Sequence, residues 1–304
     1  MKIVLTGSLG NIGKPLTETL VQKGHAVTVI SSTPERRAAI ESRGATAAIG
    51  SMFDPLFLTN IFTGADIVYL METMEAAGDM FDQSVDFLGR ISEIGYNYKT
   101  AVSESGVKRV IHLSSVGAHL HKGNGILLFH HNVEQILSTL SADVSIRFLR
   151  PVGFYINTYS FIHSIKDKGA IFSNYGGDQK EPWVSPLDVA AVIAEETGKP
   201  FIGRTVRYIA SDEVSPNEFA RAIGKAIGKP DLKWVAVPDE QLLSVWLSIG
   251  FNRQIAEGFI ETQASQGSGL LYEDFYKHLP VFGKVKVADF VRDFAKAYVS
   301  DNNS

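Results

Sequence analysis

The sequence contains no cysteine among its 304 residues. Disulfide bonds, zinc sites built on thiolates and catalysis by a thiol are therefore excluded. Stability has to come from packing and polar contacts, and a chain of this length buries roughly three quarters of the surface that its unfolded form exposes.

Long apolar runs and a large excess of one charge are also missing. No run approaches the ~18 residues of a membrane span, and the apolar start, MKIVL, is too short for a signal-peptide core. The net charge is −4 and the pI is about 6.1, which gives no basic surface for a polyanion. We therefore expect a soluble, cytoplasmic protein that binds neither nucleic acid directly nor a membrane.

Hydrophobic periodicity predicts strands that alternate with helices in the first half of the chain. Residues 2–6 form a short run rich in β-branched residues that stops at Gly7, which is typical of a strand buried on both faces. From residue 11 to 23 apolar residues recur every four positions, which indicates a helix. The alternation continues with strands at 26–30, 45–49, 66–71, 108–113 and 143–149, and with helices at 34–43, 54–63, 80–105 and 128–140. This order predicts βαβ units and an α/β fold of the Rossmann type, a doubly wound parallel sheet.

The alternation breaks after Pro151. Segment 169–181 is rich in Gly, Asn and Asp and is expected to be irregular. Segment 183–197 then indicates a helix, 204–237 a strand, a helix and a strand, and the remainder is mostly helical. We predict a dinucleotide-binding domain at 1–152, to which 182–200 returns, and a smaller, mostly helical lobe for substrate or partner at 153–181 and 201–304.

A glycine-rich turn lies between the first strand and the first helix. Its spacing, Gly7-x-x-Gly10-x-x-Gly13, in this strand–helix context is typical of dinucleotide binding. Gly7 is expected to allow the tight turn, Gly10 to let a pyrophosphate approach the backbone, and Gly13 to let the helix pack on the sheet. The free amides at the helix start would hold the phosphates together with the helix dipole. The expected cofactor contacts in the turn therefore also include Ser8, Asn11 and Ile12.

The residues at the end of the second strand help to distinguish NAD binding from NADP binding. An acidic residue there would bind the ribose 2′-hydroxyl of NAD, but the strand ends in Ser31 and Ser32, and Arg36 and Arg37 follow. Hydroxyls and a guanidinium suit a 2′-phosphate, so NADP(H) is favoured over NAD(H). The alternative is that both arginines lie on a solvated helix face.

These features, taken with four later segments, resemble the NmrA-like group of atypical short-chain dehydrogenases/reductases, which includes quinone- and dye-reducing enzymes and cofactor-sensing regulators. The resemblance extends over nearly the whole chain. It rests on the glycine turn and on the segments 110–117 (VIHLSSVG), 130–134 (HHNVE), 147–157 (RFLRPVGFYIN) and 183–190 (WVSPLDVA).

The resemblance implies further contacts around the nicotinamide. Phe154, Tyr155 and Asn157 would flank its pocket, with Tyr155 and Asn157 on the substrate side, and Pro151 would contact the cofactor. Independently, the carboxyl edge of an open α/β sheet is where ligands bind, which adds Ser114, Ser115 and Met71 at strand ends. A plain turn is the alternative for the two serines.

The chain departs from the wider superfamily at its acid–base machinery. None of its tyrosines has a lysine four residues later, so the usual Tyr-x-x-x-Lys acid is missing. His130 occupies the position that is often lysine, and Ser32 falls near the position that is often arginine. His130 and Glu134 are spaced i, i+4 on a predicted helix, where the carboxylate would keep the imidazole charged as a ribose ligand or proton donor. A histidine without chemistry is the alternative.

Four histidines gather between residues 119 and 131, which raises the question of a metal. No carboxylate joins them at ligand spacing, so solvated loop histidines are the simpler interpretation and no metal is expected. The four are His119, His121, His130 and His131.

Two functions fit these observations. The first is an NAD(P)H-dependent oxidoreductase that passes a hydride to a small acceptor such as a quinone, a dye or a carbonyl compound. The second is a catalytically inactive NADP(H)-sensing protein, which the missing Tyr-x-x-x-Lys favours. The sequence leaves open whether the chain works alone, as a homodimer or with a protein partner.

Overall fold

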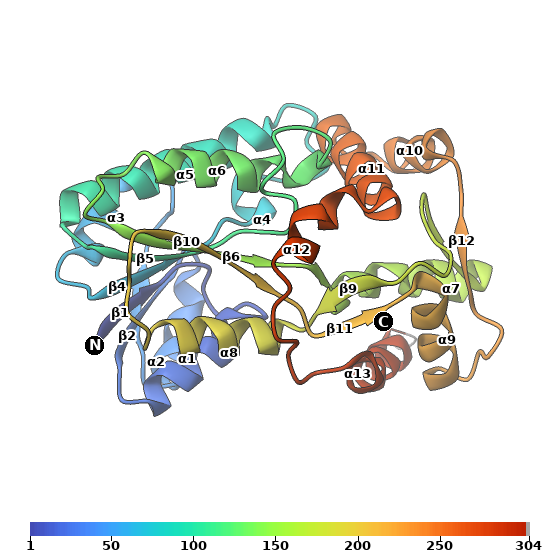
Figure 1. Cartoon of the computed structure of the whole chain (residues 1–304), viewed down its shortest axis with the longest axis horizontal. Helices are drawn as coiled ribbons and strands as arrows, with labels where there is room; N and C mark the ends of the chain where they lie inside the picture. Colours follow the sequence, from blue (N-terminus) through green and yellow to red (C-terminus); the bar gives the residue numbers. More distant parts are fainter. Residues whose placement is uncertain (302–304) are drawn as a thin grey trace.

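A seven-stranded parallel sheet forms the centre of the computed structural model, which describes residues 1–301 (Figure 1). Its strands lie in the order β3-β2-β1-β4-β5-β6-β10, and every neighbouring pair is parallel. The doubly wound Rossmann-type sheet predicted from the sequence is confirmed. The strand bounds are β1 (Lys2–Leu5), β2 (Ala26–Ser31), β3 (Thr46–Ile49), β4 (Ile67–Leu70), β5 (Arg109–Leu113), β6 (Ser145–Pro151) and β10 (Arg204–Ile209).

Helices cover both faces of this sheet, and each face has its own buried apolar cluster (Figure 1). The strands are apolar on both sides because each side is covered, which is why they lack the alternation of a half-exposed strand. One face carries α1 (Gly13–Gln22), α2 (Arg37–Glu41) and α8 (Pro186–Glu196). The other carries α3 (Pro55–Phe62), α4 (Met74–Ala77), α5 (Phe87–Ser105) and α6 (Leu128–Ser138).

The smaller lobe is built around a third apolar cluster in which aromatic rings of Tyr155, Trp183, Phe219 and Phe290 pack together. Two small sheets support it, one with the order β11-β9-β7 and the other pairing β12 with β8. Its strands are β7 (Gly153–Phe154), β8 (Ala170–Ser173), β9 (Glu181–Val184), β11 (Asp212–Val214) and β12 (Lys233–Ala236). Its helices are α7 (Ile162–Lys168), α9 (Pro216–Ala226), α10 (Asp239–Ser248), α11 (Arg253–Ser268), α12 (Glu273–Lys277) and α13 (Val287–Ser300). Short 3₁₀ turns are η1 (Pro34–Arg36), η2 (Gly125–Leu127), η3 (Tyr155–Phe161) and η4 (Leu270–Tyr272).

The boundary between the two parts differs from the expected division at residue 201, because the chain passes between them more often. Strand β10 belongs to the central sheet, where it pairs with β6 from Arg204–Ile146 to Ile209–Pro151. It is the edge strand, and its first half is exposed. The sequence predicts this strand but not its place in the central sheet, because its first half lacks the apolar run of a buried strand. Part of the segment expected to be irregular, 169–181, forms β8 and the first residue of β9.

The long helix expected over 80–105 begins later, at Phe87. Asp86 caps it by accepting a hydrogen bond from the amide of Gly89 at 3.1 Å. Asp82 holds the preceding turn by accepting from the amide of Ser84 at 2.8 Å. Short acidic side chains compete for backbone amides in this way and favour caps over helix interiors. None of the helices within residues 1–301 is long and apolar enough to span a membrane.

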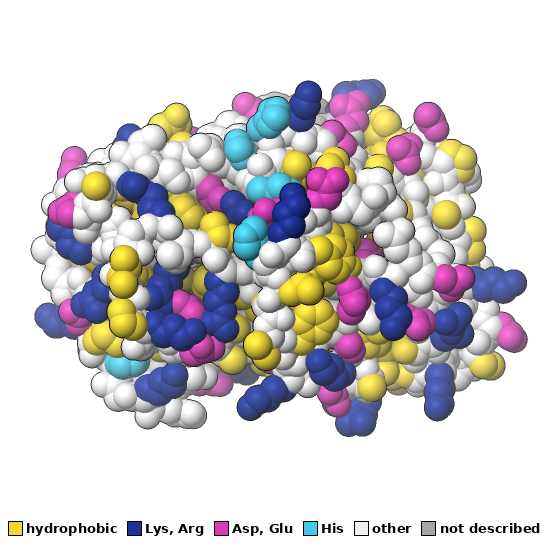
Figure 2. All heavy atoms as spheres, in the orientation of Figure 1, with side chains coloured by type: hydrophobic (Ala, Val, Ile, Leu, Met, Phe, Trp, Pro, Cys, Tyr) yellow, Lys and Arg dark blue, Asp and Glu magenta, His cyan; other side chains and the backbone are white. Residues whose placement is uncertain are grey.

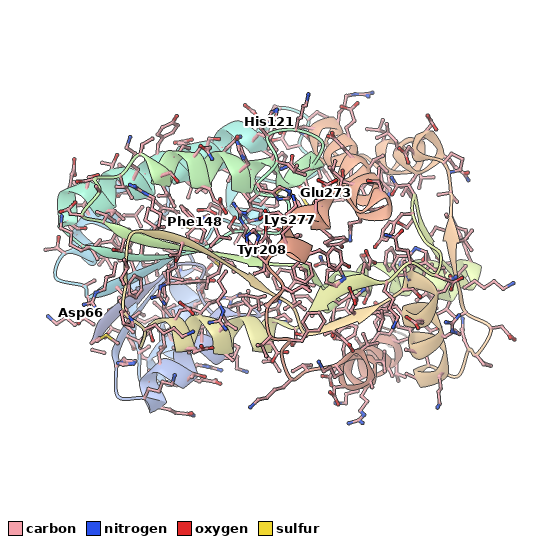
Figure 3. The ribbon with its side chains drawn as sticks, viewed as in Figure 1. Asp66, His121, Phe148, Tyr208, Glu273 and Lys277 are labelled. Atoms are coloured by element: carbon pink, nitrogen blue, oxygen red, sulfur yellow. The ribbon has the colours of Figure 1, made fainter. Side chains whose placement is uncertain are left out.

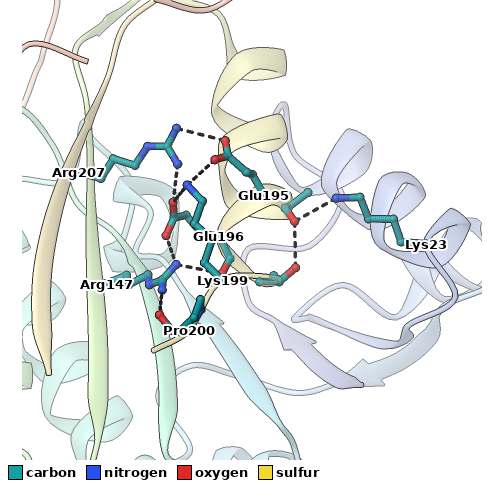
Figure 4. A network of polar contacts seen from close by, with 9 residues as sticks. Lys23, Arg147, Glu195, Glu196, Lys199, Pro200 and Arg207 are labelled. Carbon is teal, nitrogen blue, oxygen red and sulfur yellow. Dashed lines mark hydrogen bonds and ion pairs between the residues drawn. The ribbon is translucent and has the colours of Figure 1, made fainter. Parts of the chain in front are cut away.

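A network of charges at the end of α8 fastens this helix to the sheet (Figure 4). Glu196 is almost fully buried and pairs with Arg147 of β6 and with Arg207 of β10, while Lys199 contacts it at 2.9 Å. Arg147 also donates to the backbone carbonyl oxygens of Glu196, at 3.0 Å, and of Pro200. The neighbouring Glu195 is half-exposed at 49%.

We predict that Glu196→Gln lowers the free energy of unfolding by about 3 kcal/mol, because it leaves the buried Arg147 guanidinium without its counter-charge. Glu195→Gln is the matched control and should cost less than about 1 kcal/mol, as expected for an exposed pair. Urea unfolding of both variants measures the difference. Equal losses for the two variants would contradict the role of Glu196.

Candidate functional site

The site lies at the carboxyl edge of the central sheet, where the strand order reverses. After β1 the chain builds β2 and β3 on one side, and from β4 it builds β5, β6 and β10 on the other. The connections on the two sides leave the edge in opposite directions, and such a reversal between β1 and β4 is where ligands of open α/β sheets bind. The glycine turn follows β1 and Met71 follows β4, so both lie at this reversal.

The three glycines of the turn have different surroundings. Gly7 has a φ of +83°, and a side chain there would overlap Sδ of Met71. A side chain at Gly13 would overlap the carbonyl oxygen of Ser8, so the close approach is within the turn itself and not between helix and sheet as expected. At Gly10 the only protein atom within 4 Å of an added Cβ is the carbonyl oxygen of Gly7, at 3.7 Å. The protein's own packing thus requires Gly7 and Gly13, whereas the space beside Gly10 is left open.

The helix that follows the turn begins without a side-chain cap. Ile12 occupies the cap position of α1, and its apolar side chain is buried in the core, so only its backbone faces the turn. Asn11 is exposed. Amides at such a helix start, together with the dipole of the ten-residue helix, favour an anion.

At the end of β2, some polar side chains form contacts within the protein and others are exposed. The Ser31 hydroxyl is buried, accepts a hydrogen bond from the Thr33 amide at 3.2 Å and contacts the Ser8 hydroxyl at 3.1 Å. Ser32 is exposed. Arg37 pairs with Glu41 at 3.5 Å, whereas Arg36 forms no ion pair within residues 1–301. Arg36 is therefore the arginine that is available for a ligand at this edge.

The hydroxyl of Ser114 is committed to the protein itself. It donates to Glu134 at 2.5 Å in the buried interior. Glu134 is in turn held by Arg150 through two hydrogen bonds, Nε to Oε1 at 2.9 Å and Nη2 to Oε2 at 2.6 Å. Ser114 therefore links the end of β5 to α6, and the neighbouring Ser115, which is half-buried, is the serine of the pair that remains for a ligand.

His130 is neutral, contrary to the expectation that Glu134 keeps it charged. Glu134 is neutralised by Arg150. Burial lowers the pKa of His130 well below its ordinary value, and the nearby charge of His112 lowers it further. Its Nδ1 is buried without a hydrogen-bond partner in the described part of the chain. His131, by contrast, uses its Nδ1 to contact the Ala118 carbonyl oxygen at 2.9 Å.

A buried contact between a histidine and a carboxyl was not identified from the sequence. His112 of β5 contacts both oxygens of Glu72, at 3.0 and 3.2 Å, and both side chains are fully buried. His112 also packs edge-on against Phe148, which is labelled on the central sheet in Figure 3. The available signal was a histidine inside an otherwise apolar strand, which needs a polar partner when it is buried.

The residues expected on the substrate side lie in different environments. Tyr155 is fully buried in the aromatic core of the lobe, and its hydroxyl donates to the Val285 carbonyl oxygen at 3.2 Å. This packing corrects the substrate role expected for it. Asn157 is exposed, Phe154 is half-buried against the core, and Pro151 is buried at the end of β6.

A second buried carboxyl lies in the lobe and was also missed. Glu181 of β9 accepts hydrogen bonds from the hydroxyls of Tyr175 and Tyr272, each at 3.2 Å. Gln266 donates to the same two hydroxyls, at 3.4 and 3.3 Å. Burial raises the pKa of Glu181 to about 7. No local sequence pattern marks this residue: Tyr175 is six residues away, but Tyr272 is 91 away.

His119 lies near charged side chains of α12, among them Asp274, Glu273 and Lys277. Figure 2 shows histidine, basic and acidic side chains gathered at the middle of one face, and Figure 3 places Glu273, Lys277 and Tyr208 there. His119 has both ring nitrogens buried without partners. Over residues 1–301 no three His, Asp or Glu side chains are grouped as metal ligands.

Several proteins are similar to this chain. The (4-alkanoyl-5-oxo-2,5-dihydrofuran-3-yl)methyl phosphate reductase of Streptomyces griseus is 24% identical over 268 residues, which cover 88% of each protein. Among solved structures, an NADPH-dependent quinone oxidoreductase from Escherichia coli superposes with a TM-score of 0.78 at 19% identity, covering 96% of this chain and 99% of that one. Triphenylmethane reductase of Citrobacter sp. gives 0.74 at 18% identity, covering 97% and 100%. At these identities the structural likeness shows a shared fold.

The family follows from a match of a different kind. The model of the NmrA-like family matches residues 1–279. This range contains the glycine turn, the whole central sheet and the lobe as far as α12. The chain therefore belongs to the NmrA-like family.

Proposed function

We propose that this chain is an NAD(P)H-dependent oxidoreductase that transfers a hydride to a small acceptor such as a quinone, a dye or a carbonyl compound. The observation that carries the proposal is the turn after β1, in which the space beside Gly10 is open while Gly7 and Gly13 are closely packed. An open backbone position beside an uncapped helix start is what a pyrophosphate requires.

Proteins similar to this chain support the same class. The relative from Streptomyces griseus is named a reductase. The quinone oxidoreductase of Escherichia coli is described in complex with NADPH, and the reductase of Citrobacter sp. in complex with NADP(H).

Residues at this edge of the sheet are proposed to bind a nicotinamide dinucleotide along its whole length. The amides of the glycine turn would bind the pyrophosphate, and Ser32 and Arg36 the 2′-phosphate, so NADP(H) is preferred. A bound cofactor would supply the hydride. At its nicotinamide end, the neutral His130 would bind ribose hydroxyls, and Asn157 would contact the acceptor. The groups proposed to line that end are Met71, Ser115, Pro151 and Phe154.

A cofactor-sensing protein without turnover is the second candidate. The observation that favours it is the lowered pKa of His130. Without a charged imidazole, nothing at this position replaces the acid of the missing Tyr-x-x-x-Lys. A quinone-like acceptor takes its proton from water as readily as from a side chain, so the two functions are separated by turnover itself.

We predict that the purified protein oxidises NADPH with at least one acceptor in a panel of quinones, triphenylmethane dyes and aldehydes, and that Gly10→Val abolishes this. The new side chain would occupy the pyrophosphate position, so NADPH affinity should fall by at least about a hundredfold, or ~2.7 kcal/mol. Calorimetry measures binding, and absorbance at the reduced-nicotinamide band measures turnover.

The melting temperature provides the control for this variant. Gly10→Val should melt like the wild type, whereas Gly13→Val should melt lower because its side chain overlaps the Ser8 carbonyl. Unchanged NADPH affinity in Gly10→Val would refute the cofactor site. Tight NADPH binding without turnover on any acceptor would favour the sensor.

We predict that Arg36→Ala weakens NADPH binding and leaves NADH binding nearly unchanged. The loss of a charge-assisted hydrogen bond to the 2′-phosphate costs on the order of 1.5–3 kcal/mol, or roughly 10- to 150-fold in affinity. Arg37→Ala is the matched control, because Arg37 is engaged by Glu41. If Arg37→Ala has the larger effect, the assignment of Arg36 is wrong.

We predict that His130→Ala lowers NADPH affinity about three- to tenfold, the loss of one ordinary hydrogen bond, and leaves turnover at saturating NADPH unchanged. Because the pKa of His130 is lowered well below its ordinary value, NADPH affinity should not titrate through this residue between pH 7 and 8. His131→Ala, one position along α6, should leave affinity unchanged. A loss of turnover at saturating NADPH in His130→Ala would identify an acid and contradict the neutral role.

A further inference from the structure

The buried carboxyl of Glu181 has only uncharged partners. Its two oxygens accept from the hydroxyls of Tyr175 and Tyr272, and Gln266 completes the cluster. Within residues 1–301 Glu181 forms no ion pair, and the adjacent Lys180 is exposed to solvent. A carboxyl without a counter-charge in such a place is more stable in its neutral form.

The charged and titratable groups around the cluster do not change this preference. Tyr276 of α12 faces Glu181 and donates its hydroxyl to Glu213 of β11 at 2.8 Å. Loss of the proton from Glu181 would therefore place an unpaired charge in the interior.

The segment that contacts Glu181 also covers the ends of two central strands. We refer to residues 266–272, the last turn of α11 and η4, as the cap segment. Its Leu271 lies so close to Gly117, in the loop after β5, that an added Cβ there would be 2.7 Å from the leucine Cδ2. Its Gln266 lies 3.8 Å from the corresponding position at Gly153, just after β6. Tyr272 packs in the same apolar cluster as the residues that end β5 and β6.

The ends of β5 and β6 are where the nicotinamide and the acceptor would meet. Figure 1 shows α11 and α12 lying between the central sheet and the lobe, over this edge. The cap segment is thus fixed on one side by apolar contacts with the strand ends and on the other side by hydrogen bonds to Glu181.

We propose that Glu181 is a positioning residue for the acceptor site: in its neutral form it holds the cap segment closed over the ends of β5 and β6, and its ionisation releases the segment. The acceptor site itself rests on the proposed function, but the link between Glu181 and the cap segment does not.

The sign of the pH dependence follows from the raised pKa of Glu181, about 7 against 4.5 for the free side chain. A carboxyl whose pKa is raised on folding contributes stability that is fully present below the unfolded value and is lost as the pH rises through the folded value. The cap segment should therefore open more readily at pH 8 than at pH 6, with the opening constant growing up to about tenfold per pH unit below 7 and levelling off above it.

Hydrogen exchange of the whole protein tests the link without any acceptor. We expect the amides of 266–276 in the wild type to exchange about tenfold faster at pH 8 than at pH 6, after correction for the intrinsic effect of pH on exchange. Glu181→Gln, which cannot ionise, should show no such increase. Glu261→Gln, the same change at an exposed position of α11, should behave like the wild type.

Kinetics then tests the consequence for the acceptor site. The acceptor KM of the wild type and of Glu261→Gln should rise between pH 6 and 8, that of Glu181→Gln should not, and NADPH affinity should stay constant in all three. Tyr272→Phe, which removes one donor to the carboxyl, should raise cap-segment exchange already at pH 6 and serves in place of Glu181→Gln if that variant does not fold.

The outcomes separate the two proposals. Equal pH dependence of exchange in the wild type and Glu181→Gln overturns the inference, and so does a Tyr272→Phe variant with wild-type exchange. The expected exchange pattern without NADPH oxidation on any acceptor keeps the link between Glu181 and the cap segment and refutes the oxidoreductase.

Discussion

The buried guanidinium of Arg150 connects the parts of this molecule that form the site. It binds Glu134 of α6 through two hydrogen bonds and contacts the Tyr208 hydroxyl of β10 at 3.1 Å. Tyr208 donates to Asp274 of α12 at 2.6 Å, so the connection reaches the C-terminal lobe. A buried charge of this kind is costly unless every partner is in place, which makes the relative placement of α6, β10 and α12 specific.

This constraint explains why the chemistry differs from what the helix pattern predicts. The i, i+4 spacing of His130 and Glu134 is compatible with an imidazole–carboxylate pair. The Glu134 carboxylate instead forms an ion pair with Arg150 and accepts a further hydrogen bond from Ser114. His130, which is half-buried, is therefore left without a counter-charge, and its pKa is lowered well below its ordinary value. The same argument, that a buried carboxyl follows the partners it has, separates Glu134, which is paired with a cation, from Glu181, which is surrounded by neutral donors.

The fold was predictable in outline because its strands and first helices are defined by local patterns. The parallel sheet, the glycine turn and the helix after it all follow from runs of neighbouring residues. The prediction failed where β10, whose first half is exposed, joins the central sheet instead of the lobe, and where capping carboxylates delay a helix, as before Phe87. It also failed at Tyr155, because a place next to the strand end does not specify which way a side chain points, and this ring packs into the lobe core.

The sequence by itself determined the Rossmann-type sheet, the turn with its open position at Gly10, and the absence of the Tyr-x-x-x-Lys acid. These depend on residues that are close together in the chain, where backbone geometry and periodicity leave few alternatives. Only the tertiary structure decided which buried polar groups pair: Glu134 with Arg150, 16 residues away, His112 with Glu72, 40 away, and Glu181 with Tyr272, 91 away. Such pairs form because folding removes water from each group and leaves it to find a partner among whatever segments packing brings beside it, and no local pattern encodes that choice.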